Sequence, residues 1–111
     1  MVIGGALDSI TPFITDALPS YQEGTGIRFI VRISDTGHCA FIPLCVPGVC
    51  GDGCPPAGIE TAAANDLVLR YAVPFVLRYV AGKRRYERLL HPELAPPGVV
   101  VVTDATLRAG A

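Results

Sequence analysis

Residues 2–8 read VIGGALD and residues 27–33 read IRFIVRI. The first is a short apolar run that stops at an acidic residue, as a buried parallel strand does. The second alternates apolar side chains on one side with Arg28, Ile30 and Arg32 on the other, which predicts a strand nearer a sheet edge. Between them, residues 12–22 predict a short helix. A strand-helix-strand unit of this kind predicts an α/β fold with parallel strands.

The strongest helical signal covers residues 61–81, with Gly82 placed to end the helix. Its apolar positions nearly encircle it, and Pro74 inside it predicts a kink because proline has no N–H to donate. Residues 86–90 predict one further turn, and we interpret His91 as a surface residue near that helix end. Residues 98–102 read GVVVV, a short β-prone run within a tail that we assign to residues 91–111.

The composition is apolar for a chain of this length. Hydrophobic residues make up 50% of the 111 residues and charged residues 17%, against about 25% charged in an average soluble domain. Nine basic and ten acidic residues give a net charge of −1, which excludes an electrostatic affinity for nucleic acid. Residues 39–51 are too short and too rich in proline to cross a membrane, so we predict no transmembrane segment.

A long loop over residues 34–58 contains all four cysteines of the chain: Cys39, Cys45, Cys50 and Cys54. Two disulfides would restrain this loop and allow three pairings. Four thiolates could instead bind zinc, although the spacings differ from the Cys-x-x-Cys pairs of structural zinc sites. Free or mixed thiols are the third alternative. Disulfides would favour an exported protein, in the periplasm or outside the cell.

Two side chains suited to catalysis follow the two predicted strands. Asp8 comes directly after the first strand, and His38 lies five residues after Ile33. The carboxyl ends of parallel strands meet at one edge of a sheet, where active sites of open α/β sheets gather. A carboxylate that orients an imidazole, which then acts as a general base, needs this arrangement. Taken singly, Asp8 is equally typical of a helix cap and His38 of a surface loop.

The segment from Gly5 to Pro12, GALDSITP, resembles the acid-bearing segment of α/β-hydrolase-fold enzymes, in which Gly-x-x-Asp is followed by proline. The segment from Thr36 to Phe41, TGHCAF, is similar to their Gly-His-x-x-Phe base segment, 30 positions after the acid. The long helix after it is similar to the C-terminal helix of dienelactone-hydrolase-like and platelet-activating-factor-acetylhydrolase-like esterases. The resemblance covers residues 2 to about 90.

The resemblance implies that Asp8 and His38 are the acid and base of a Ser-His-Asp triad. The family's Gly-x-Ser-x-Gly motif is absent: the serines are Ser9, Ser20 and Ser34, and none lies between glycines. We therefore expect residues 1–90 to be the C-terminal part of an α/β-hydrolase domain, inactive without an N-terminal part that carries the serine. The intact enzyme would act on a small ester or lipid-like substrate and need no cofactor or metal.

Substrate contacts are predicted weakly. The residues expected to line one wall of a substrate pocket are Phe41, which ends the base segment, Ile42 after it, and Tyr21 in the short helix. The remaining walls would come from the part of the enzyme that this chain does not supply.

Two hypotheses of other classes stay open. In one, the chain is a small Cys-rich structural or zinc-binding module, in which Asp8 caps a helix. In the other, it is a noncatalytic subunit that completes another chain's sheet through its first strand. On its own, we expect a chain with an unpaired sheet edge and a nearly all-apolar helix to self-associate.

Overall fold

The computed structural model describes residues 1–43, 53–55 and 58–108. Three strands form one sheet: β1 (Val2–Gly5), β2 (Phe29–Ile33) and β3 (Val99–Thr103), in the order β1-β2-β3. β1 pairs with β2 in parallel, as predicted, whereas β3 pairs with β2 in antiparallel orientation. The α/β class is therefore confirmed, but the prediction of an all-parallel sheet is wrong, and the three strands do not establish an α/β-hydrolase fold.

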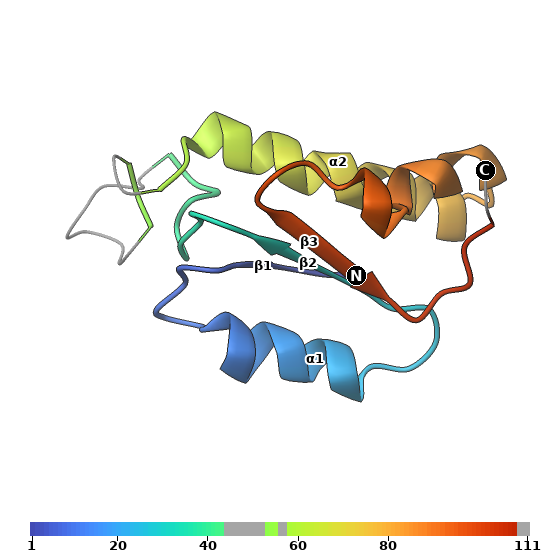
Figure 1. The fold of residues 1–111 in the computed structure, drawn as a ribbon, viewed down its shortest axis with the longest axis horizontal. Coiled ribbons are helices and arrows are strands. Elements are labelled where there is room, and N and C mark those ends of the chain that lie inside the picture. Colours follow the sequence, from blue (N-terminus) through green and yellow to red (C-terminus); the bar gives the residue numbers. More distant parts are fainter. Residues whose placement is uncertain (44–52, 56–57, 109–111) are drawn as a thin grey trace.

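The path of the chain after β2 explains why β3 is antiparallel. The long helix α2 (Thr61–Tyr79) returns the chain along the sheet, so that the Tyr79 ring lies 5.9 Å from that of Phe29 at the start of β2. Two 3₁₀ segments, Arg84–Leu90 and Pro92–Leu94, then lead it back toward the end of β2. There the Ser34 N–H donates to the Gly98 carbonyl at 2.8 Å, and β3 begins (Figure 1). The β-prone run predicted for residues 98–102 thus becomes an edge strand of the sheet.

The predicted helices form close to their expected bounds. The segment predicted over residues 12–22 forms a π-helical turn at Phe13–Ala17 that continues into α1 (Leu18–Glu23). The long helix ends at Tyr79, two residues before its predicted end. Within the described part of the chain, no helix is long and apolar enough to cross a membrane.

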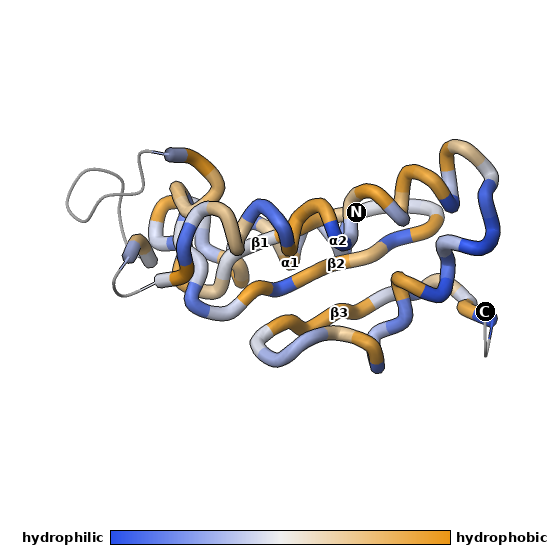
Figure 2. The backbone as a smooth tube through the Cα atoms, turned by 90° about the horizontal axis from the view of Figure 1, so that it is seen from above, coloured by the Kyte–Doolittle hydropathy of each residue, from blue (hydrophilic) through white to orange (hydrophobic). Residues whose placement is uncertain are grey.

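The core lies between the sheet and α2, while α1 covers the opposite face (Figure 1). Alternate residues of β2, namely Phe29, Val31 and Ile33, are buried in one cluster with Tyr71 of α2. In Figure 2 both elements are mostly hydrophobic in colour, interrupted by hydrophilic positions. The buried cluster consists of Phe29, Val31, Ile33, Tyr71, Leu90, Val99 and Val101. Phe75 of α2 packs edge-on against Phe29, with ring centroids 5.8 Å apart. This packing fixes β2 and the loop after it, from which His38 projects.

Candidate acid-base site at the carboxyl ends of β1 and β2

The loops that follow β1 and β2 are bound to each other by backbone hydrogen bonds. The Ala6 N–H donates to the Ile33 carbonyl, and the Leu7 N–H donates to the Thr36 carbonyl, each at 2.9 Å. A Cβ at Gly5 would lie 2.2 Å from the Thr36 oxygen, so this approach requires glycine at that position. The loop carrying Asp8 is therefore held against the loop carrying His38.

Asp8 and His38 meet across this contact, as the sequence predicts. Asp8 Oδ2 lies 3.0 Å from His38 Nδ1, although the two residues are 30 positions apart. Asp8 is mostly buried, with 13% of its side chain exposed, whereas His38 is 37% exposed. The geometry thus combines a sheltered carboxylate with an imidazole that reaches the surface.

Several donors orient the Asp8 carboxylate. Oδ1 accepts the backbone N–H groups of Ile10 at 3.0 Å and Thr11 at 2.8 Å, and Oδ2 accepts the Thr11 hydroxyl at 2.9 Å. Burial raises the pKa of Asp8, but the hydrogen bonds from Thr11, His38 and Ile10 outweigh it and bring that pKa below its usual value. Asp8 is therefore ionised at neutral pH and held in one orientation.

An ionised carboxylate only accepts hydrogen bonds, so His38 Nδ1 carries the proton that Asp8 Oδ2 accepts. The Thr11 hydroxyl oxygen also lies 3.1 Å from Nδ1. In the neutral imidazole, a proton on Nδ1 leaves the lone pair on Nε2, the atom a general base uses. Among the described residues, no protein group is hydrogen-bonded to Nε2. The pair can therefore accept a proton from a group brought to it from outside.

No serine of this chain completes the arrangement. Ser9, Ser20 and Ser34 all lie within the described ranges, and none is hydrogen-bonded to His38. A groove of about 250 Å³ does lie beside Asp8, between β1 and the helical segment that follows it. Residues of β1, the Thr11 side chain and the first turns of the following helix line it.

The three residues expected to contact substrate lie in different parts of the structure. Phe41 is partly buried and packs against the core cluster, and Ile42 beside it is 44% exposed. Tyr21 lies at the opposite end of the sheet, because its carbonyl accepts a hydrogen bond from Arg28, just before β2 begins. Tyr21 therefore lies away from the acid-base pair. The helix antiparallel to β1 carries residue 21 away from the end where Asp8 lies.

The cysteine predictions fall partly outside the described residues. Cys39 and Cys54 are both buried, and there is no free cysteine in the part of the chain that the structure describes. Cys45 and Cys50 lie outside it, so disulfides and their pairing stay a prediction. Over the described ranges, no three His, Cys, Asp or Glu side chains come together in a way that could hold a metal ion.

Sequence reasoning missed two polar residues. Thr11 lies three residues after Asp8, and a threonine at that spacing is a known local partner of an aspartate. Glu87, within the turn predicted over residues 86–90, is 2% exposed and lies between Arg78, at 3.1 Å, and Arg108, at 3.2 Å. Burial raises the pKa of Glu87, and the hydrogen bonds from Arg108 and Arg78 bring it below the usual value. Glu87 thus ties the C-terminal segment to α2.

No protein-family model, curated protein or solved structure matches this chain. The hypothesis of an esterase therefore depends on the residues of the two short motifs and on the site they form.

Proposed function

We propose that this chain supplies the acid, Asp8, and the base, His38, of a serine ester hydrolase. The observation that carries the proposal is the 3.0 Å contact between Asp8 Oδ2 and His38 Nδ1 at the carboxyl ends of adjacent parallel strands. The three additional hydrogen bonds to Asp8 support it, because a carboxylate that orients a catalytic imidazole must itself be fixed.

The nucleophilic serine would come from a segment outside these 111 residues. The outer edge of β1 is unpaired among the described strands, and Asp8 is among the residues that line the groove beside β1. A strand added to that edge would satisfy the free N–H and C=O groups of β1. If that strand ran parallel to β1, the turn after it would lie at the same end of the sheet as His38. This is where a serine on a tight strand-to-helix turn must be for its proton to reach Nε2.

The chemistry follows from the orientation of the pair. As the serine oxygen bonds to the ester carbonyl carbon, its proton passes to His38 Nε2. Asp8 stays ionised and stabilises the imidazolium that forms. The proton then passes from Nε2 to the leaving alcohol oxygen as the ester bond breaks. Water repeats the sequence on the acyl-enzyme and releases the carboxylic acid. Phe41, at the end of the base segment, and Ile42 after it are the candidates for contact with the acyl or alcohol group.

The test compares this chain with the product of any longer reading frame that contains it, using hydrolysis of p-nitrophenyl butyrate. We expect the chain alone to hydrolyse no faster than free imidazole. We expect the longer protein to turn over, to lose its activity after His38→Ala and to keep it after the control change His91→Ala. Full activity in His38→Ala, or a longer protein that neither contains a serine segment nor hydrolyses esters, contradicts the proposal.

A further inference from the structure

The face of α2 that points away from the sheet is apolar. Its exposed side chains include Leu69, Val73, Val76 and Val80, which are between 46% and 77% exposed. A helix packed on a sheet ordinarily presents charged and polar residues on its outer face. These four residues, called the outer stripe here, run along nearly the whole second half of α2 and just past its end.

The spacing of the outer stripe fits a helix as the covering element. The intervals between successive residues are four, three and four, which is the alternation that keeps apolar side chains on one seam between two packed helices. A continuous apolar seam of this kind is one that a second helix can cover.

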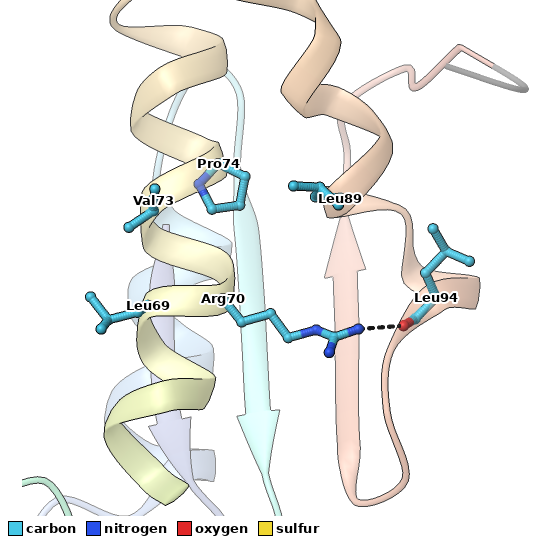
Figure 3. A pocket seen from close by; sticks show the side chains of 6 residues that line it. All are labelled: Leu69, Arg70, Val73, Pro74, Leu89 and Leu94. Atoms are coloured by element: carbon cyan, nitrogen blue, oxygen red, sulfur yellow. Dashed lines mark hydrogen bonds between the residues drawn. The ribbon is translucent and has the colours of Figure 1, made fainter. Parts of the chain in front are cut away.

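The surface beside the outer stripe is hollowed. An open cavity of about 540 Å³ separates α2 from the 3₁₀ segments, lined by Leu69, Arg70, Val73, Pro74, Leu89 and Leu94. Leu69 and Val73 leave α2 on one side, and Arg70 reaches across to the Leu94 carbonyl at 3.2 Å (Figure 3). The hollow lies at the N-terminal half of the stripe, where it can accept side chains from a second helix.

Charge is distributed unequally between the two ends of α2. Near its beginning, α2 carries the exposed Asp66, and directly after its end the chain carries the exposed Lys83, Arg84 and Arg85. A second copy of this helix in antiparallel orientation would bring its basic end to the acidic end of the first. The helix dipoles would also oppose each other favourably. One self-complementary surface is what a two-fold symmetric dimer requires.

We propose that the outer stripe is the interface of an antiparallel dimer of this chain. Centred on the stripe, Val73 lies opposite Val76 of the second copy and Leu69 lies opposite its Val80. The same orientation brings Lys83, which follows the end of α2, to the end of the second copy that carries Asp66, at both ends of the interface. This inference is independent of the proposed hydrolase activity, because it uses neither Asp8 nor His38.

The first measurement is the mass of the protein in solution by sedimentation velocity, at concentrations from about 1 to about 200 µM. We expect the mass to rise toward twice the 11.7 kDa of the chain. Val76→Glu buries two carboxylates at the centre of the interface and should weaken the dimer about 100-fold or more. Val100→Glu, at a similarly exposed valine of β3, is the matched control and should leave the dimer unchanged.

The second measurement tests the register with a charge exchange. The Asp66→Lys variant places a positive charge near Lys83 of the second copy. The repulsion between like charges should weaken the dimer about tenfold. Asp66→Lys combined with Lys83→Asp restores opposite charges and should recover most of the affinity. Both residues are exposed, so these variants keep the test valid even if Val76→Glu fails to fold.

Three results overturn the proposal. One is a wild-type chain that stays monomeric up to the highest concentration. Another is a dimer that survives Val76→Glu, which would assign association to a different surface, such as the free edge of β1. The third is a double charge exchange that binds no better than Asp66→Lys alone.

Discussion

Two histidines of this chain each lie beside a carboxylate, and their surroundings differ. His38 Nδ1 is 3.0 Å from Asp8, and His91 Nδ1 is 3.1 Å from Glu93. Asp8 is 13% exposed and comes from a loop 30 residues away, whereas Glu93 is 70% exposed and only two residues from its histidine. The histidines show the opposite order of exposure: the side chain of His91 is 11% exposed, whereas that of His38 is 37% exposed. The prediction of His91 as a surface residue is therefore wrong.

The comparison shows that the distance between an imidazole and a carboxylate does not by itself define an acid-base pair. His91 Nε2 is buried and has no hydrogen-bond partner in the described structure, so no substrate group reaches it. Its carboxylate partner is solvated and free to turn away. In the Asp8–His38 pair, the carboxylate is held in place and the imidazole is accessible. Proton transfer to a substrate requires this combination.

The largest difference is expected in ester hydrolysis by the longer enzyme that we propose. Asp8→Asn keeps the shape of the side chain but turns an amide toward His38, which favours the wrong tautomer. It should lower kcat about 10³- to 10⁴-fold. Glu93→Gln should change kcat less than about threefold, because an exposed pair contributes little. Equal losses in the two variants would show that neither carboxylate has a specific role in proton transfer.

A smaller difference is expected in chemical reactivity of the chain on its own. Diethyl pyrocarbonate acylates an accessible, unprotonated imidazole nitrogen, and peptide mass spectrometry locates the adduct. His38 should react about ten times faster than His91, because Nε2 of His91 is released only by local opening of the structure. Comparable rates would mean that His91 is as accessible as His38 and would remove the contrast between the two sites.

The sequence was sufficient for those parts of the fold that local pattern determines. Hydrophobic periodicity predicted β1, β2 and both helices to within about two residues, because each buries one regular face. The orientation of β3 could not be predicted. It depends on how two 3₁₀ segments return the chain to Gly98, and neither has a repeating pattern long enough to show its direction.

The candidate site was predictable for a different reason. Asp8 and His38 follow adjacent parallel strands, so topology alone brings them to one edge of the sheet. The Thr11 hydroxyl and the buried Glu87 were not predictable to the same degree. Their roles depend on side-chain contacts at 2.9 to 3.2 Å, one within a turn and the other with arginines 9 and 21 residues away. Sequence spacing does not specify contacts of that kind.

The pH dependence of the free energy of unfolding should differ modestly between variants of Asp8 and variants of Glu93. Burial raises the pKa of Asp8, and the hydrogen bonds to its carboxylate lower that pKa by more. The ionised form is therefore favoured in the folded state. The stabilisation is present above the usual aspartate pKa and is lost as the pH falls through the lower folded value. Urea unfolding should therefore show a difference between wild type and Asp8→Asn that is constant above about pH 5 and shrinks below about pH 4.

Glu93→Gln is the control for this titration. Backbone hydrogen bonding and His91 lower the pKa of Glu93 as well, but its side chain is 70% exposed, so the pH-dependent difference should be smaller than for Asp8→Asn. If Glu93→Gln showed the larger pH-dependent difference in the free energy of unfolding, Glu93 and not Asp8 would be the carboxylate that the folded structure shelters.

The smallest effect is expected at Thr11, whose hydroxyl connects both members of the pair. Thr11→Val removes the 2.9 Å hydrogen bond to Asp8 Oδ2 but keeps the backbone N–H bond to Oδ1. The pKa of Asp8 should move upward toward its usual value. kcat in the intact enzyme should fall about fivefold, which corresponds to one hydrogen bond of about 1 kcal/mol.

Thr15→Val is the matched control, since the Thr15 hydroxyl bonds Asp16 and touches neither Asp8 nor His38. It should change neither the Asp8 titration, followed by carboxyl carbon NMR, nor kcat. A loss in Thr11→Val as large as that in Asp8→Asn would mean that the hydroxyl, and not the backbone of the loop, holds the carboxylate. The site would then depend on one side-chain contact and resemble the loosely held His91–Glu93 pair more than its geometry indicates.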